Sequence, residues 1–290
     1  MRALVLSGGA SKGQYLIGAL DYLVTEKNAK YSILCGVSIG ALITGFAAQY
    51  KIGEEDDLIE DLKELSLSIH TSDIHKRWPL GYISALWKTG ARSSKPLREF
   101  ISNNIDASKI ASSGRLLRVG ATKLSGNPSE PFTLFTETSS NIIEAIKAST
   151  ALSPLLESIE IQGEWFVDGG FQCPTPLKAA IVAGATEIDV VLCYPTKMAS
   201  FEYGKKLTAL DIFKREVDLA THKLAWSEIK QTQAINKLVL AGLASDKKFI
   251  KLNIIVPKSE LSVDSLEFNP KDAKRLQEQG FNDAKEYFSF

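Results

Sequence analysis

Apolar runs of strand length alternate with segments of helical periodicity along most of the chain. Residues 2–6 form the first apolar run, and a glycine-rich turn leads from it into residues 14–23, whose apolar positions recur at helical spacing. A second apolar run, 31–35, precedes a segment that is compatible with a buried helix, 41–48. Because strand, helix, strand and helix follow one another, the pattern predicts a mainly parallel sheet covered by helices on both faces.

The same alternation continues through the rest of the chain. Further strands are predicted at 116–122, 132–136, 188–193 and 249–256, with a hairpin over 158–167. Further helices are predicted at 54–67, 96–101, 142–149, 177–183, 207–244 and 270–287. The predicted fold class is α/β, with three layers and a mainly parallel central sheet. We expect a single domain over residues 1–290, with a lid or insertion around 54–112 and a mainly helical C-terminal part from about 201.

Charge and cysteine content narrow the classes of protein. Lys plus Arg and Asp plus Glu both number 34, so the formal net charge is zero. Nucleic-acid-binding proteins usually carry a basic excess, which argues against nucleic acid as the main partner. The three cysteines, Cys35, Cys173 and Cys193, lie in apolar surroundings and are interpreted as small core residues in a reducing compartment.

Targeting and membrane-spanning signals are not evident in the pattern. The first apolar run breaks at Ser7, and the longest one, 33–48, is short and interrupted by Gly, Ser and Thr. We therefore expect a soluble, cytoplasmic protein whose contact with membranes is peripheral.

The first chemical signal is Gly36-Val37-Ser38-Ile39-Gly40, which lies between a predicted strand and a predicted helix. A strand that enters a helix through Gly-x-Ser-x-Gly is the context of a nucleophile elbow, a sharp and strained turn that exposes a serine hydroxyl. A side chain at Gly36 or Gly40 is expected to collide with the neighbouring strand or helix. Ser38 is therefore the candidate nucleophile.

Acyl transfer by a serine also needs a base and hydrogen-bond donors for the oxyanion. The glycine-rich turn 7–13 can supply backbone N–H donors where a helix begins. Asp168 ends a predicted strand, and Gly169 and Gly170 let a partner approach its carboxylate closely. A simple Asp-Gly turn is the alternative interpretation of this last motif.

A histidine base is the other possibility. The chain contains three histidines, and only His222 follows Asp168 in the order Ser, Asp, His. His222 lies within a predicted helix, which favours a packed or surface role over a catalytic one. His70 and His75 precede Asp168 and belong to the irregular segment 70–94.

Taken together, these segments resemble the patatin-like phospholipase family. The resemblance rests on Gly8-Gly9-Ala10-Ser11-Lys12-Gly13, on the elbow motif, on Asp168-Gly169-Gly170 and on the segment 145–154, and it covers residues 2–195. That family uses a Ser-Asp dyad without a histidine. The resemblance therefore implies that Ser38 is the nucleophile and Asp168 the base.

The resemblance also implies the remaining parts of the site. The backbone of Gly8, Gly9 and Ala10 would form the oxyanion hole, with Ala10 standing where the family has a third glycine. Lys12 matches the family's Lys or Arg, and Lys12, Gly169 and Gly170 are the substrate-binding candidates. The implied activity is hydrolysis of fatty-acyl esters, of phospholipid or related substrates, with no metal or organic cofactor.

Several alternatives stay open at this point. The same acyl-enzyme would serve an acyltransferase, a thioesterase or a lysophospholipase, because water and other acceptors meet the same intermediate. Phosphate or nucleotide binding is less favoured, because the loop lacks the second glycine of G-x-G-x-x-G and the Lys-Ser/Thr of a P-loop. A non-catalytic scaffold is disfavoured with both dyad residues present. The sequence predicts no particular oligomeric state.

A cluster of aromatic and aliphatic residues lies in the irregular segment. It consists of Trp78, Tyr82, Ile83, Leu86 and Trp87, and basic residues flank it. One interpretation is that the cluster caps the site and touches lipid surfaces, since basic amphipathic segments favour anionic interfaces. Packing within the insertion is the other.

Overall fold

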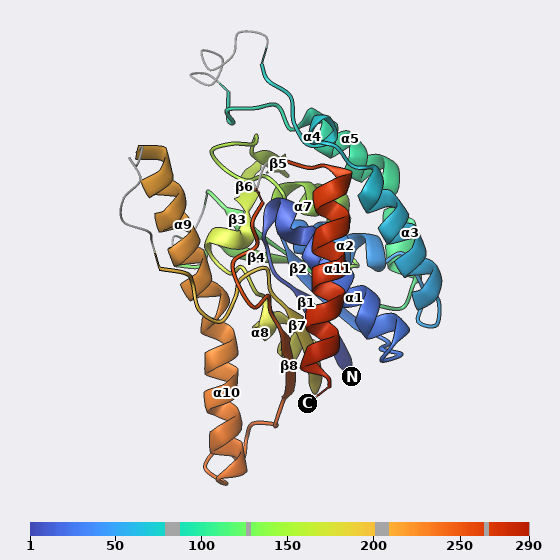
Figure 1. The fold of residues 1–290 in the computed structure, drawn as a ribbon, viewed down its shortest axis with the longest axis vertical. Coiled ribbons are helices and arrows are strands. Elements are labelled where there is room, and N and C mark those ends of the chain that lie inside the picture. Colours follow the sequence, from blue (N-terminus) through green and yellow to red (C-terminus); the bar gives the residue numbers. More distant parts are fainter. Residues whose placement is uncertain (79–87, 126–128, 201–208, 264–266, 290) are drawn as a thin grey trace.

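The computed structural model describes residues 1–78, 88–125, 129–200, 209–263 and 267–289, and within them eight strands form one mixed sheet with helices around it (Figure 1). The strands pair in the sequence β5-β6-β3-β2-β1-β7-β8, in which β2 and β6 pair with successive parts of one edge of β3, and β4 pairs with its other edge. The strands are β1 (Arg2–Leu6), β2 (Ile33–Val37), β3 (Leu116–Lys123), β4 (Phe132–Thr136), β5 (Ile159–Ile161), β6 (Glu164–Asp168), β7 (Glu187–Val191) and β8 (Lys251–Ile255). Strands β3, β2, β1, β7 and β8 are parallel, whereas β4 and β6 run antiparallel to β3. The predicted α/β class is confirmed.

Helices cover both faces of this sheet. They are α1 (Gly13–Thr25), α2 (Ile39–Ala47), α3 (Glu55–Ser68), α4 (Thr71–Ile74), α5 (Lys95–Asn104), α6 (Ala107–Ser112), α7 (Ile142–Ser149), α8 (Leu177–Val182), α9 (Ala209–Ala225), α10 (Ser227–Leu240) and α11 (Pro270–Tyr287), with short 3-10 turns η1 (Ala10–Lys12) and η3 (Gly169–Phe171). Alternate residues of β1 enter different cores, because successive strand side chains point to opposite faces. Leu4 and Leu6 pack with α1, α2, α7 and α11, whereas Ala3 and Val5 pack with α8 and α10.

Helix α1 is buried on nearly every side, because α11 crosses it at very short range. The sequence predicts only one apolar face, formed by Leu16, Ala19, Leu20 and Leu23. In the structure Gly18 of α1 lies so close to α11 that a Cβ there would overlap the backbone of Gln277. In the same way, a Cβ on Gly280 of α11 would overlap the carbonyl of Tyr15. The C-terminal helix therefore completes the layer that carries the glycine-rich loop.

The second strand and the helical stretch over 207–244 are among the predicted elements that differ from the observed ones. The second strand covers 33–37 and not 31–35, because Gly36 and Val37 still pair with β3. The helical stretch predicted over 207–244 is interrupted at Trp226, whose indole N–H donates to the Pro195 carbonyl at 3.2 Å. All three cysteines are free; Cys35 and Cys193 are buried, and Cys173 is half-buried. Within the described ranges, no helix is both long and apolar enough to cross a membrane.

The predicted insertion around 54–112 contains α3 to α6, and its role as a lid stays a prediction. Most of the predicted aromatic cluster, namely Tyr82, Ile83, Leu86 and Trp87, lies outside the described residues. Its first member, Trp78, donates its indole N–H to the Gly90 carbonyl at 3.1 Å. The ammonium group of Lys88 lies 5.1 Å from the Trp78 ring centre.

Candidate active site

Ser38 occupies a sharp turn between β2 and α2. Its backbone angles, φ 57° and ψ −130°, lie in a region that residues with side chains rarely adopt. Glycines hold the turn from both sides: a Cβ on Gly36 would overlap the carbonyl of Gly40, and a Cβ on Gly40 would overlap the carbonyl of Leu6. The collision expected at these two positions is therefore present in the structure. Ser38 itself is only partly buried, at the start of α2.

A buried serine that the sequence did not single out anchors the turn. The Ser38 N–H donates to the Ser149 hydroxyl oxygen at 2.9 Å, and the Ser149 hydroxyl donates to the Gly120 carbonyl at 2.6 Å. Ser149 ends α7 and is fully buried. It lies within the segment 145–154 that supports the family resemblance, which was the only signal that could have drawn attention to it. Ser149 thus ties the elbow to β3.

Asp168 lies at the end of β6, a strand that is antiparallel to β3. Strands β2 and β6 both pair with the β3 edge that does not face β4, so β2 and β6 follow one another along that edge. Val37 pairs with Gly120, and Asp168 pairs with the next residue, Ala121. The carboxyl ends of β2 and β6 therefore meet head to head, which brings Asp168 beside Ser38. The two small residues of β3 leave room for this junction.

The Asp168 carboxyl is buried and only half satisfied. Its Oδ1 accepts the Gly170 N–H at 2.7 Å, whereas its Oδ2 accepts no hydrogen bond from the described residues. Burial raises the pKa of Asp168 from 3.8 to about 6, and the nearby Ser38 hydroxyl and the Gly170 N–H oppose this rise. The Ser38 hydroxyl is close enough to the carboxyl to lower its pKa, so the two groups are neighbours.

The glycine-rich loop lies directly against Ser38, but its N–H groups are not equivalent. Gly8 packs closely on the nucleophile candidate, since a Cβ there would lie at a tight 3.2 Å from the Cβ of Ser38. The Gly8 N–H already donates to the Pro174 carbonyl at 3.1 Å. The N–H groups of Gly9 and Ala10 donate to no other described residue, and both residues are partly buried. The oxyanion hole expected from Gly8, Gly9 and Ala10 stays a prediction, in which Gly9 and Ala10 are the donors that have no other described partner.

The three substrate-binding candidates occupy different surroundings. Gly169 packs on β3, where a Cβ would lie 2.7 Å from the Gly120 carbonyl, and Gly170 donates its N–H to Asp168. Both glycines therefore support the position of Asp168, and a contact with substrate is an additional prediction. Lys12 is the last residue of η1, and its ammonium group lies 5.7 Å from the ring centre of Tyr194. Its role in substrate binding stays a prediction.

The histidines occupy other places. His222 of α9 bonds through Nε2 to the Pro195 carbonyl at 3.0 Å, the same oxygen that Trp226 contacts. His70 is exposed at the start of α4, near Asp73. His75 is buried beside the Arg92 guanidinium. The structure thus brings Asp168 to Ser38 and engages His222 elsewhere.

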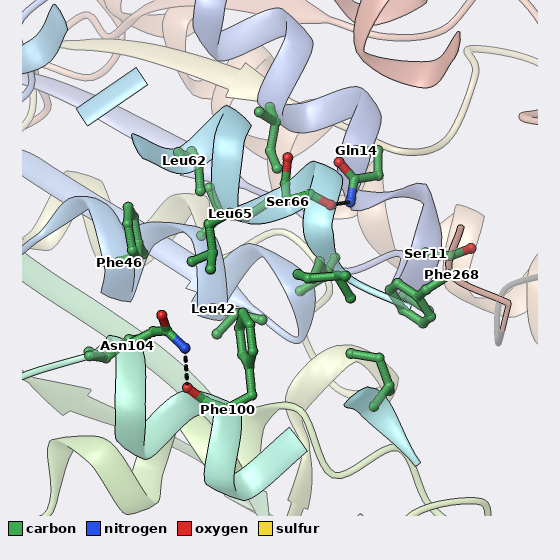
Figure 2. A pocket seen from close by; sticks show the side chains of 18 residues that line it. Ser11, Gln14, Leu42, Phe46, Leu62, Leu65, Ser66, Phe100, Asn104 and Phe268 are labelled. Atoms are coloured by element: carbon green, nitrogen blue, oxygen red, sulfur yellow. Dashed lines mark hydrogen bonds between the residues drawn. The ribbon is translucent and has the colours of Figure 1, made fainter. Parts of the chain in front are cut away.

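An apolar groove begins beside the elbow and follows α2 (Figure 2). Ala10 and Ile39 line the groove next to the glycine-rich loop and the elbow, and Leu42 and Phe46 line it further along α2. Among the described residues that line it, none carries a charge.

A strained serine turn, a buried carboxyl and a glycine-rich loop meet at the carboxyl end of the parallel strands, which is the layout of an α/β protein with a serine-nucleophile site. Comparison of the sequence with known families agrees with this class. The chain matches the family described as "Patatin-like phospholipase" over residues 4–181, and it belongs to that family.

Two individual proteins illustrate the similarity. The chain is 25% identical over 185 residues to "Probable lipid hydrolase 463L" of Invertebrate iridescent virus 6, a match that covers 62% of this chain and 63% of the viral protein. Its fold is similar to that of VipD from Legionella pneumophila, with a TM-score of 0.51 and 14% identity, over 99% of this chain and 66% of VipD. The chain thus spans less than two thirds of either relative.

Proposed function

We propose that this protein is a serine lipid acyl hydrolase of the phospholipase A or lysophospholipase type. The observation that carries the proposal is the junction of β2 and β6 on one edge of β3, which places the buried, half-satisfied carboxyl of Asp168 beside the strained Ser38. The membership in the patatin-like phospholipase family supports a lipid substrate.

The residues of the site supply each step of ester cleavage. Ser38 Oγ attacks the ester carbonyl carbon while its proton passes to Asp168 Oδ2, and the N–H groups of Gly9 and Ala10 stabilise the resulting oxyanion. Asp168 then donates this proton to the leaving alcohol as the carbon–oxygen bond breaks, which leaves an acyl ester on Ser38. A water molecule gives a proton to Asp168 and attacks the acyl carbon. The fatty acid departs as the proton returns to Ser38.

The raised pKa of Asp168 suits this role. A carboxylate with a pKa of about 6 is a stronger base than an ordinary aspartate, and it is still mostly ionised at neutral pH. The unused Oδ2 has a free lone pair to accept the serine proton. No histidine is needed in this scheme, and none of the proposed proton transfers involves a metal or an organic cofactor.

The test is ester hydrolysis by the purified chain with matched variants. We expect release of fatty acid from phospholipid, lysophospholipid or p-nitrophenyl esters, and a loss of at least about a thousandfold in kcat with Ser38→Ala and Asp168→Asn. The exposed residues Ser112 and Asp246 provide the matched controls Ser112→Ala and Asp246→Asn, which should retain activity. Undiminished hydrolysis by folded Ser38→Ala would refute the proposal.

The product identifies the acyl acceptor. If acylated alcohol forms in place of free fatty acid when an alcohol is added, the protein is an acyltransferase, and preferred cleavage of thioesters would indicate a thioesterase. Phosphate binding by the loop has less support, because the Gly8 N–H is engaged by Pro174. A cytoplasmic location with peripheral membrane contact stays a prediction that cell fractionation would test.

A further inference from the structure

We propose that the apolar groove along α2 holds the acyl chain of the substrate, and that Phe268, from the C-terminal segment, is the wall residue that makes it selective for long chains. This inference rests on the proposed function of Ser38 as the acylated nucleophile. Phe268 lies beyond residues 4–181, the part of the chain that matches the family. The proposal therefore gives the C-terminal segment a role in substrate binding.

The groove begins at residues next to Ser38, as a site for the acyl chain requires. Ile39 directly follows the nucleophile, and Ala10 is one of the two candidate oxyanion donors; both line the groove. From Ile39 to Phe46 the groove follows α2 for about 10 Å at 1.5 Å per residue. In Figure 2 Ser11 and Phe268 lie on one side, and Phe46 and Asn104 on the other.

The chemistry of the lining is suited to hydrocarbon. The few polar side chains in it are engaged with protein partners, so that they add little polar surface to the groove. Gln277 donates to Gln14 Oε1 at 2.9 Å and to Ser66 Oγ at 2.8 Å, and Asn104 donates to the Phe100 carbonyl at 2.8 Å. An acyl chain placed here exchanges contact with water for contact with apolar side chains, which favours binding in proportion to its length.

Phe268 is fixed at the groove by a reciprocal pair of hydrogen bonds. The Phe268 N–H donates to Thr71 Oγ1 at 2.9 Å, and the Thr71 N–H donates to the Phe268 carbonyl at 3.0 Å. The Thr71 hydroxyl also donates to the Phe268 carbonyl at 3.2 Å. Thr71 begins α4, so these hydrogen bonds between Thr71 and Phe268 join the C-terminal segment to the region predicted as an insertion.

Phe268 also borders a second, smaller hollow whose lining is mixed. Glu267 and Asp272 line that hollow together with apolar residues such as Val263 and Leu276, and it shares Ser11, Gln14, Ile69 and Phe268 with the groove. Phe268 thus lies between an apolar space and one that contains two carboxylates. Removing the ring would open the acyl site towards two carboxylates and water, which penalises the binding of long chains.

The experiment measures chain-length selectivity in p-nitrophenyl esters from butyrate to palmitate. For Phe268→Ala we expect KM for the palmitate ester to rise roughly tenfold, while kcat/KM for the butyrate ester stays within about twofold, in line with the discrimination that small changes in apolar pockets produce. Phe268→Leu, which keeps an apolar side chain, should lie between. Phe249, a half-exposed phenylalanine outside the groove, provides the control Phe249→Ala, which should match the wild type.

The hydrogen bonds between Thr71 and Phe268 allow a second test with a smaller expected effect. Thr71→Val removes the hydroxyl and should change selectivity in the same direction as Phe268→Ala, by a smaller factor, whereas Thr71→Ser keeps the hydroxyl and should change nothing. An equal effect of Phe268→Ala on all chain lengths, or selectivity unchanged in folded Phe268→Ala, would overturn the proposal.

Binding separates this proposal from the catalytic one. Fatty-acid binding to the Ser38→Ala variant can be measured without turnover. A fluorescent fatty acid should bind to this variant and should be displaced more strongly by palmitate than by octanoate. The double variant Ser38→Ala, Phe268→Ala should bind the fatty acid roughly tenfold more weakly. If the wild type hydrolyses no ester but this binding pattern holds, the proposed function fails and the groove assignment stands. If esters are cleaved but Phe268→Ala leaves fatty-acid binding unchanged, the groove assignment fails alone.

Discussion

The main-chain N–H of Ser38 donates a hydrogen bond to the side chain of Ser149, a residue 111 positions further along the chain. Ser149 passes the connection on to the Gly120 carbonyl, so the strained serine turn is held by a chain of two hydrogen bonds that ends on β3. The geometry of the elbow therefore depends on α7 as well as on its own glycines.

Replacing Ser149 by Ala should lower kcat with little change in KM. The Ser38 N–H would lose its partner, which costs about 1–3 kcal/mol in a buried setting, and the hydroxyl of Ser38 would be less well positioned. We expect kcat to fall roughly ten- to a hundredfold. Ser113→Ala is the matched control, since Ser113 is buried and bonds to the Ile110 carbonyl at 3.0 Å. Equal kinetics for Ser149→Ala and wild type would show that the turn at Ser38 keeps its conformation without Ser149.

The pH dependence of activity should report Asp168. The base must be ionised, and its pKa of about 6 places the transition there, so kcat/KM should rise with pH through about 6 and then level off. The measurement is a pH profile with a short soluble ester. A profile centred near pH 4 would mean that Asp168 is not desolvated in solution or is not the base.

The same carboxyl should make the native state less stable at neutral pH than at acid pH. Because burial raises the pKa from 3.8 to about 6, the folded protein holds a proton that the unfolded chain has already released between these values. This contribution to stability is full below about 4 and is lost as pH rises through about 6, with a magnitude of no more than about 3 kcal/mol. Asp168→Asn should therefore flatten the pH dependence of the unfolding free energy in this window, as measured by urea titration. An unchanged slope would contradict the assignment.

Ala10 is the residue at which this chain departs from the family's third glycine. Its φ of 51° is in the left-handed region, which costs a residue with a side chain about 1–2 kcal/mol. Ala10→Gly removes that strain but increases the conformational freedom of the unfolded chain, which costs about 0.5–1 kcal/mol. Stability should therefore rise by about 0–1.5 kcal/mol, and activity should persist because the N–H remains. Ala10→Val should lower kcat roughly tenfold or more, since a β-branched residue disfavours this conformation. Full activity in Ala10→Val would remove Ala10 from the oxyanion hole.

His222 should prove dispensable for chemistry. His222→Ala removes one of two hydrogen bonds to the Pro195 carbonyl, because Trp226 supplies the other. We expect kcat/KM within about twofold of the wild type and a loss of stability of about 1 kcal/mol, read from thermal unfolding. Abolished activity in a folded His222→Ala protein would restore the Ser, Asp, His arrangement.

Prediction from sequence succeeded where the signal is local. The C-terminal helix begins and ends where predicted, at Pro270 and Tyr287, because Asn269 accepts the Asp272 N–H as a helix cap and proline fits the first turn. The hairpin at 158–167 follows from two residues with positive φ, Gln162 at 54° and Gly163 at 81°. Asn141, predicted as the cap of α7, occupies that position but makes no side-chain capping bond.

Prediction was weaker where a contact joins distant segments. The motif around Ser38 was recognisable, yet Ser149 was not, because a single serine at the end of a helix carries no pattern of its own. The position of Asp168 at the end of a strand was predicted, but its strand runs antiparallel to β3 and pairs beyond the end of β2. Hydrophobic alternation does not specify pairing partners, so this arrangement was not available from the sequence.

By itself, the sequence determined the strands, the helices and the glycine-flanked turn that strains Ser38, since these depend on residues within a few positions of one another. Tertiary structure alone decided that β2 and β6 meet on one edge of β3, that α11 closes over α1, and that Phe268 reaches the groove from the other end of the chain. It also decided the chemistry of Asp168, because the surrounding fold, and not the neighbouring residues, removes its carboxyl from water and raises its pKa to about 6.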